Sequence, residues 1–266
     1  MKKWIFLSVF LVLSCTDGEL IEGIEGIENI VVEEITTTTT LNEGLVASYS
    51  FSNNTNDSSG NELHGVLYEG GYGECRSNKE FSSLQLDVND NPSWGERNDR
   101  VEVTYDPIMD VDHITISAWV NTQEKSSPYD DRHYSIVSRW FTDWTDENEE
   151  KGAYAFYIDG NQNLAFTDRF QFLVAKEVFI EYNVWTHITV TIDNEKLRFY
   201  VNGGFIYEEK LNIGFKLPHN SLNLFIGERR MYNGYWYHFE GKLDEVNMWG
   251  RALSPCEVLE VYNQNI

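Results

Sequence analysis

The chain has 266 residues, 14% of them aromatic, and a formal net charge of −23 at pH 7. A chain this acidic lacks the cationic face that binds nucleic acid or anionic lipid, so neither is an expected electrostatic partner. The length allows one large domain or two small ones, and the aromatic content with only 5 Pro is typical of a strand-rich globular fold.

The first fourteen residues have the pattern of a secretory signal. Lys2 and Lys3 precede an apolar run over residues 4–14, which is shorter than the roughly 20 residues that span a membrane. The run ends in Val-Leu-Ser-Cys, which resembles a bacterial lipobox. The resemblance implies cleavage after residue 14 and acylation of Cys15. The alternative is an ordinary signal peptide with a chance cysteine.

Residues 15–42 are predicted to form a disordered tether. The segment is acidic and Thr-rich, and no Lys or Arg occurs between Lys3 and Arg76. Such a segment repels itself and has little apolar surface to bury. Thr16, followed by Asp17 and Glu19, resembles the sorting signal of surface lipoproteins. This resemblance implies a lipid anchor in a bacterial outer membrane, with the protein facing outward.

Residues 43–266 are predicted to form one all-β domain. Short alternating or apolar segments recur with turn signals between them, which is typical of an antiparallel sandwich. Asn202-Gly203 predicts a tight hairpin turn. The expected strands are 44–51, 66–68, 114–121, 154–158, 164–166, 185–192, 197–201, 205–207 and 224–227.

The segment 239–254 predicts a strand that leads into a helix. Apolar residues change parity between Leu243 and Val246, which predicts a β-bulge near Asp244 and Glu245. Ser254, Pro255 and Glu257 are suited to the N-cap, N1 and N3 positions of a helix reaching about Asn263. Its inner face is expected to carry Val258, Leu259 and Tyr262.

Three signatures resemble the laminin G-like domains of the concanavalin A-like lectin/glucanase superfamily. They are D-S-S-G-N-x-x-H-G at 57–65, W-x-x-I-x-V with L-R-F-Y-V-N-G over 185–203, and G-x-L-D-E-V with R-A-L-S over 241–254. Together they cover nearly all of the chain after residue 43. The resemblance implies a two-sheet antiparallel jelly roll with a short C-terminal helix.

The same resemblance implies a calcium site between the two ends of the domain. Calcium prefers carboxylate and carbonyl oxygens. Asp57, Asn61 and Asp244 could supply side chains, and Gly60 and His64 could supply backbone carbonyls. The alternative is that Asp57 orders an Asx-turn and Asp244 accepts a bond from a backbone amide.

Two loops rich in aromatic residues form the candidate glycan site. One is an insertion over 122–152 and the other is a loop over 228–238. Exposed aromatic rings stack on sugars, and Arg donates to hydroxyls. The candidate ligand-binding residues are Arg139, Trp140, Trp144, Arg229, Tyr235 and Trp236. The alternative is that they anchor long loops to the sandwich.

Cys75 and Cys256 are the remaining cysteines, and the sequence leaves a disulfide and two buried thiols equally open. The E-x-D-x-E strand of the superfamily's glucanases and the motif of its lyases are not found, so no catalytic residue is predicted. We therefore expect a non-catalytic, carbohydrate-binding surface lipoprotein. The alternatives are an adhesion or scaffold module for a protein partner and, more distantly, a diverged hydrolase.

Overall fold

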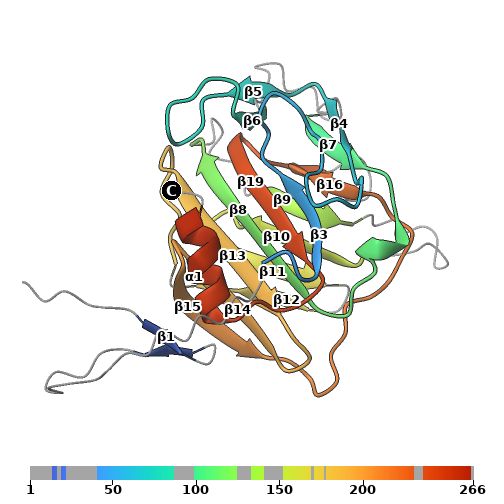
Figure 1. The fold of residues 1–266 in the computed structure, drawn as a ribbon, viewed down its shortest axis with the longest axis vertical. Helices are drawn as coiled ribbons and strands as arrows, with labels where there is room; N and C mark the ends of the chain where they lie inside the picture. The colour runs from blue at the N-terminus through green and yellow to red at the C-terminus, as the bar shows by residue number, and fades with distance from the viewer. Residues whose placement is uncertain are drawn as a thin grey trace, which may run out of the picture.

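The computed structural model describes residues 14–16, 19–21, 41–86, 99–124, 133–140, 152–168, 171–176, 178–230 and 236–264. Two antiparallel sheets face each other across one hydrophobic core (Figure 1). The predicted all-β jelly roll with a short C-terminal helix is confirmed. In these ranges no helix is long and apolar enough to cross a membrane.

The first sheet has seven strands, in the order β12-β11-β10-β9-β16-β7-β4. The strands at its two edges are therefore β12 and β4. The bounds are β4 (Gly65–Tyr68), β7 (Arg100–Val103), β9 (Tyr134–Arg139), β10 (Tyr154–Ile158), β11 (Leu164–Asp168), β12 (Phe172–Val174) and β16 (Leu224–Ile226).

The second sheet follows the order β15-β14-β13-β8-β19-β6-β5, and β3 pairs with β19. This pairing joins the first and last strands of the domain, so its two ends lie side by side as expected. The bounds are β3 (Leu45–Tyr49), β5 (Gly71–Gly73), β6 (Ser83–Leu86), β8 (Ile114–Thr122), β13 (Thr186–Ile192), β14 (Lys196–Val201), β15 (Gly204–Lys210) and β19 (Gly241–Trp249).

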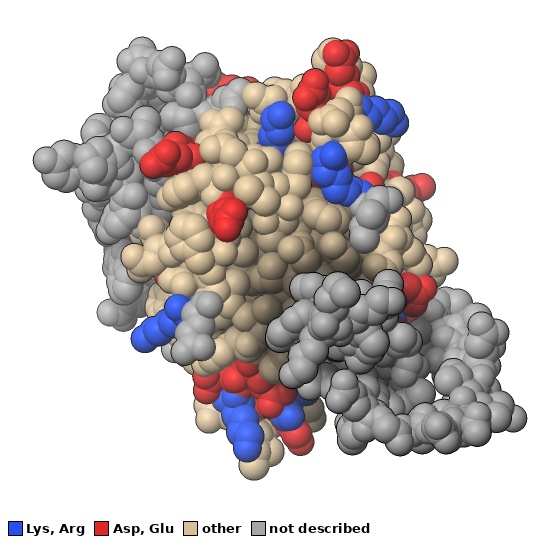
Figure 2. Space-filling view, turned by 90° about the vertical axis from the view of Figure 1, so that its left-hand side faces the viewer, with Lys and Arg blue, Asp and Glu red and all other residues tan. Residues whose placement is uncertain are grey.

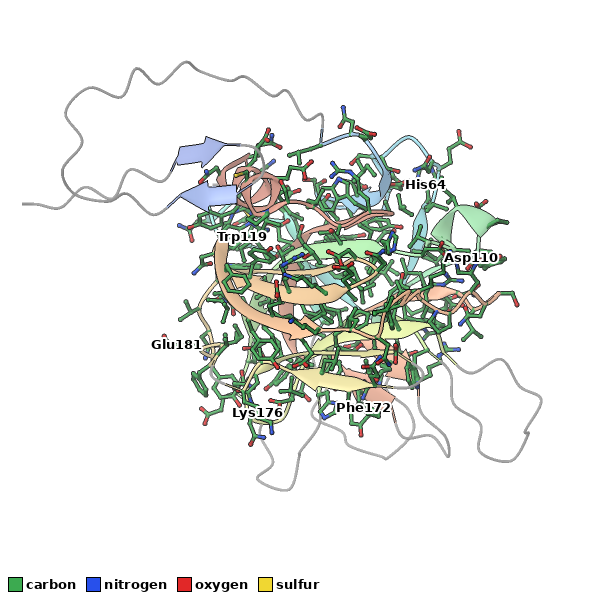
Figure 3. The ribbon with its side chains drawn as sticks, turned by 90° about the horizontal axis from the view of Figure 1, so that it is seen from below. His64, Asp110, Trp119, Phe172, Lys176 and Glu181 are labelled. Carbon is green, nitrogen blue, oxygen red and sulfur yellow. The ribbon has the colours of Figure 1, made fainter. Side chains whose placement is uncertain are left out.

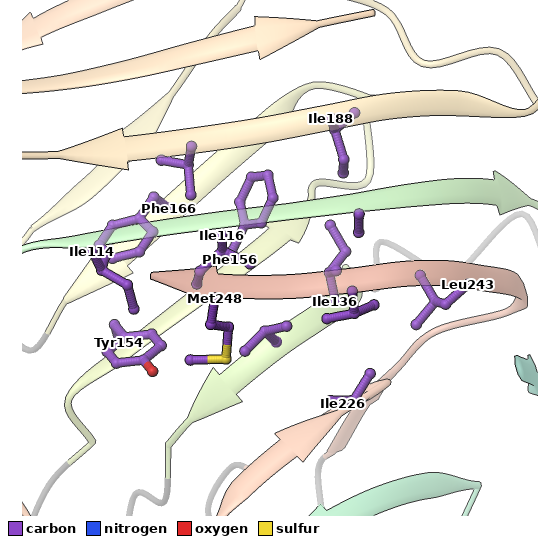
Figure 4. Close-up of a cluster of buried hydrophobic side chains, with 14 of the residues drawn as sticks. Ile114, Ile116, Ile136, Tyr154, Phe156, Phe166, Ile188, Ile226, Leu243 and Met248 are labelled. Atoms are coloured by element: carbon purple, nitrogen blue, oxygen red, sulfur yellow. The ribbon is translucent and has the colours of Figure 1, made fainter. Parts of the chain in front are cut away.

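The core lies between the sheets because alternate residues of each strand point inward. Ile116 of β8 and Ile188 of β13 face Phe156 of β10 and Phe166 of β11, and all four side chains are buried (Figure 4). Phe156 also stacks on Phe199 at 6.2 Å between ring centroids. The alternation predicted for these strands is what allows one face of each sheet to be buried.

The predicted bulge and hairpin turn are present. The register of β19 against β8 shifts between Asp244 and Asn247, and Glu245 takes a φ of 46°. Asn202 and Gly203 have φ values of 49° and 75°, as the two central residues of the tight turn require.

Helix α1 (Pro255–Gln264) begins with the predicted capping box. The Glu257 amide donates to Ser254 Oγ at 3.3 Å, and the Ser254 amide donates to Glu257 Oε2 at 2.8 Å. The fully buried apolar residues of the helix are Val258 and Val261, whereas Leu259 and Tyr262 are partly exposed. The expected inner face is therefore rotated slightly, although Tyr262 still stacks on Trp119 of β8.

Three further segments differ from the sequence-based expectations. The insertion 122–152 contains β9, a central strand of the seven-stranded sheet. The loop 228–238 contains a two-stranded sheet, β17 (Glu228–Arg230) with β18 (Trp236–His238). Within the expected tether, β1 (Ser14–Thr16) pairs with β2 (Glu19–Ile21). A short 3-10 helix, η1 (Pro107–Met109), follows β7.

Each sheet has an outer face that points away from the core. In Figure 3, Trp119 lies on the side of the sandwich that carries α1, and Phe172 lies on the opposite side. On the face drawn in Figure 2, acidic and basic side chains lie near one another around a largely uncharged middle. Among the drawn residues of that face, the net negative charge does not gather into one patch.

Candidate functional site

Asp57 accepts four hydrogen bonds from the protein itself. Its Oδ1 accepts from the amides of Ser48 and Ser59, both at 2.9 Å. Its Oδ2 accepts from Ser59 Oγ at 2.7 Å and from the Leu63 amide at 3.1 Å. The side chain therefore organises the loop between β3 and β4, as the Asx-turn alternative expects.

The other loop residues in the calcium prediction are also engaged. Asn61 Nδ2 donates to the carbonyls of Leu45 and Val46, at 3.0 Å and 2.9 Å. His64 Nδ1 accepts from the Asp57 amide at 3.1 Å, and Gly60 has a φ of 95°. These bonds hold the loop against β3.

Asp244 has a different partner. It is 3% exposed, and Arg76 Nη1 donates to its Oδ2 at 2.9 Å. Burial and the charge of Glu245 raise the pKa of Asp244 to about 7, and Arg76 opposes that shift. In the described part of the chain, no group of three or more His, Cys, Asp or Glu could hold a metal ion. Calcium binding stays a prediction.

A disulfide between Cys75 and Cys256, which the sequence leaves open, is not formed. Cys75 carries a free, buried thiol, and its Sγ lies 3.1 Å from Ser77 Oγ. Hydrogen bonds within this turn lower the pKa of the Cys75 thiol, although burial opposes the shift as the largest single effect. The spacing of two cysteines along a sequence does not show whether their Cα atoms come within disulfide range.

Arg139 was predicted to lie in an exposed loop, and this placement is wrong because the side chain is 1% exposed. Its guanidinium donates to the Met109 carbonyl at 2.8 Å, Asp110 Oδ1 at 3.0 Å, Asn220 Oδ1 at 3.1 Å and the Leu222 carbonyl at 3.3 Å. Arg139 therefore fastens β9 to the segments around η1 and residue 220. It has the anchoring role given as the alternative.

Arg229 is enclosed by aromatic rings. Its Cζ lies 4.5 Å from the ring centroid of Tyr157, 4.6 Å from that of Tyr237 and 5.9 Å from that of Trp140. His133 stacks on both tyrosine rings at 4.6 Å, and its Nδ1 lies 3.0 Å from Arg229 Nη2. We name these five residues the Arg229 cage. An arginine can only donate, so His133 Nδ1 is the acceptor.

Two of the predicted ligand residues, Arg229 and Trp140, are members of the cage, and both are buried. Arg229 is 2% exposed and Trp140 is 8% exposed, whereas His133 and Tyr237 are partly exposed. Trp144, Tyr235 and the side chain of Trp236 lie outside the described residues. The structure therefore gives no position for half of the predicted ligand set.

Ion pairs hold the same face of the seven-stranded sheet. Arg230 Nε donates to Glu228 Oε1 at 2.7 Å, and Arg100 Nη2 donates to Glu102 Oε2 at 3.2 Å. Burial raises the pKa of Glu228, and the two arginines oppose the shift. Because each arginine has an acidic partner, this cluster is internally neutralised.

The outer face of this sheet also carries a row of directly opposed residues, one from each strand. The row has large apolar side chains at both ends and small side chains between β11 and β9. From edge to edge it reads Phe172, Thr167, Ala155, Ser138, Phe225, Glu102 and Val66. Phe172 is 68% exposed and Val66 is 56% exposed.

The sequence analysis does not single out Tyr157 or Phe172. A signal for Tyr157 exists, because alternation along 154–158 places it opposite in direction to the core residue Phe156. Phe172 has no such signal, because its strand has three residues and follows no apolar period. Its exposure depends on the sheet edge that β12 occupies.

Comparison with known proteins agrees with this architecture. A family model described as the concanavalin A-like lectin/glucanases superfamily, Laminin_G_3, matches residues 95–259. Paraclostridial mosquitocidal protein 1 of Paraclostridium bifermentans is 24% identical over 198 residues, which are 70% of this chain and 15% of that protein. The chain therefore spans a small part of that relative.

Solved structures show the same fold at low identity. The binding domain of the mosquitocidal protein has a TM-score of 0.60 at 20% identity, over 84% of this chain and 52% of that one. Domain 4 of AbnA, an extracellular arabinanase of Geobacillus stearothermophilus solved with arabinotriose, has a TM-score of 0.53 at 19% identity, over 82% and 98%. The receptor-binding domain of botulinum neurotoxin D has a TM-score of 0.57 at 13% identity, over 84% and 53%. With the family model matching more than half of its residues, the chain belongs to the Laminin_G_3 family of the concanavalin A-like lectin/glucanases superfamily.

Proposed function

We propose that this chain is a non-catalytic glycan-binding module, and that it takes its ligand on the outer face of the seven-stranded sheet near β10–β12 and β18. The observation that carries the proposal is the exposed Phe172 ring on the edge strand β12. A flat aromatic ring presented to solvent on a rigid strand can stack on the C–H face of a sugar.

Two partly exposed cage residues belong to the same face. Tyr157 of β10 is opposite Ala165 of β11, which is opposite Val174 of β12, and Val174 packs on Tyr157 and Ala165. Since neighbouring strands lie about 4.8 Å apart, Tyr157 is roughly 10 Å across the sheet from β12. His133 stacks on Tyr157 and Tyr237 stacks on His133, so three aromatic rings follow one another beside this length, which fits one or two sugar units.

The names of the matched proteins support a binding role. One structure is a carbohydrate complex of an arabinanase domain, and others are receptor-binding domains of toxins. Cell entry of botulinum neurotoxin type C, which has a structure of this fold, depends on interaction with two ganglioside molecules. Arabinan and ganglioside-type glycans therefore belong in a first panel of ligands.

The test is calorimetric titration of the protein with a polysaccharide panel, in calcium and in chelator. For a glycan that binds, Phe172→Ala should weaken affinity about tenfold, which corresponds to 1.4 kcal/mol, while leaving the melting temperature unchanged because the ring is exposed. Phe205→Ala is the matched control, because Phe205 is also exposed but lies on β15 of the other sheet. Equal losses in both variants, or no binding to any glycan, would refute the proposal.

A protein partner is the second candidate, and a specific observation favours it. β15 is an edge strand, and its Phe205 and Ile206 are 49% and 41% exposed. An exposed edge strand with apolar side chains can pair with a strand of another protein. If glycans fail to bind, this edge becomes the leading candidate surface.

A further inference from the structure

Among the described residues, Arg229 is a buried cation that lacks an anionic partner. Its Nη2 is hydrogen-bonded to His133, and its Nε and Nη1 make no hydrogen bond of good geometry with a described residue, although the hydroxyls of Tyr157 and Tyr237 lie near the guanidinium. No ion pair of Arg229 with a described acid is present, and the side chain is 2% exposed. Burial lowers the pKa of Arg229, and the neighbouring Tyr157 and Tyr237 oppose that shift.

The other buried arginines have acidic partners. Arg139 pairs with Asp110 and donates to three further acceptors, and Arg100 lies between Glu102 and Glu228. Removing a charge from water without an anionic partner costs several kcal/mol in general. Contacts with aromatic faces return only part of that cost. The unused donors of Arg229 therefore need an explanation that the described residues do not supply.

We propose that Arg229 receives the carboxylate of an acidic sugar. The inference rests on the proposed glycan-binding function and names the class of sugar. A carboxylate supplies the missing charge and the acceptors for the free Nε–H and Nη1–H groups. The ring of His133, which lies beside the Arg229 guanidinium, suits the body of the sugar.

The net charge of the chain further limits which acidic glycans can bind. A net charge of −23 repels polyanions, so a polymer with a carboxylate on every unit is disfavoured at long range. Arg229 offers one uncompensated positive charge. The ligand is therefore a mostly neutral glycan with an isolated sugar acid, such as a terminal uronic or sialic acid.

Access to Arg229 is from the side of the two partly exposed members of the cage, whose rings stack on each other at 4.6 Å between centroids. Tyr157 and Trp140 are buried on the sheet side, whereas His133 and Tyr237 are partly exposed. Because Arg229 itself is 2% exposed, a carboxylate reaches it when the Tyr237 side chain turns aside. The bound sugar then replaces Tyr237 against the guanidinium.

The experiment compares matched acidic and neutral sugars by calorimetric titration of the full chain. One pair is sialyllactose and lactose, and the other is a glucuronic-acid-terminated disaccharide and its glucose-terminated counterpart. The methyl ester of each acid gives a neutral ligand of nearly the same shape. The wild-type protein should bind at least one acid tenfold or more tightly than its ester, and polygalacturonate should bind more weakly than that acid.

Variants then test whether the preference for the acid over its ester depends on Arg229. Arg229→Gln should abolish the discrimination between acid and ester while keeping the weaker binding of the neutral sugar. Arg198→Gln is the matched control, because Arg198 lies on β14 of the other sheet and is paired with Asp193 and Glu208. This control should keep the full preference for the acid.

The outcomes separate this inference from the proposed function. Equal binding of acid and ester by the wild-type protein overturns the inference and leaves glycan binding intact. A preference that survives in Arg229→Gln also overturns it. Failure of every sugar in the panel overturns the proposed function together with the inference. If Arg229→Gln does not fold, the wild-type comparison of acid with ester still decides.

Discussion

At the scale of single residues, Asp244 is an acid whose pKa lies near neutral pH. Its pKa is raised to about 7, well above the value of about 3.9 in an unfolded chain. The folded state therefore keeps a proton that the unfolded state has lost between about pH 4 and pH 7. This contribution to stability is complete below about pH 4 and is lost as the pH rises to about 7.

We predict that Asp244→Asn removes most of this pH dependence, because the amide resembles the protonated acid. Between about pH 5 and pH 8 the wild-type free energy of unfolding should fall by about 2 kcal/mol more than that of the variant, since one proton is worth about 1.4 kcal/mol per pH unit. Urea unfolding at the two pH values measures it. Asp110→Asn is the control, because the pKa of Asp110 is lowered and its titration lies below this window. Parallel changes in wild type and Asp244→Asn would contradict the prediction.

Arg139 and Arg229 show how far the exposure of a single side chain can be predicted from the sequence. Arg139 and Arg229 stand among polar and aromatic residues, and that composition predicts exposed ligand contacts. Both are buried, because β9 and the β17–β18 pair bring them beneath neighbouring segments. Burial of a long charged side chain depends on those distant partners, and no local pattern encodes it.

At the scale of elements, the capping box at the start of α1 contributes measurably to the free energy of unfolding. Ser254→Ala removes the oxygen that accepts the Glu257 amide, and the free energy of unfolding should fall by about 1 kcal/mol. The helix holds Val258 and Val261 against Trp249 and Tyr200, so part of the domain core depends on its start. Chemical denaturation measures the loss. Ser254→Thr keeps an acceptor and should lose at most half as much, and an equal loss would exclude capping as the cause.

Elements defined by short-range signals are the ones that the sequence predicts well. The bulge follows from a parity change within four residues, and the helix start follows from Ser254, Pro255 and Glu257. The strands β9, β17 and β18 were missed. β9 lies inside the long insertion, β17 and β18 have three residues each, and all three become strands through pairing with β10, β16 and each other. Asp57 and Asp244, which the sequence analysis placed together as calcium ligands, have separate partners.

At the scale of the whole molecule, the sequence proposes a lipid anchor ahead of the domain. The lipobox-like sequence proposes an acylated Cys15 as the anchor, and the first strand of the sandwich begins at Leu45.

We predict that Cys15→Ser releases the protein from the membrane fraction of the bacterial cell. Stable anchoring needs more than one acyl chain or an added basic patch, and an acidic chain has no such patch to replace the lipid. Detergent-phase partitioning of cell fractions measures the release. Cys75→Ser is the matched control, because Cys75 has a free thiol inside the domain and its loss should leave the protein in the membrane fraction. If Cys15→Ser remains with the membrane, or if both variants are released equally, the anchor is not at Cys15, and the acidic segment before the domain needs another role.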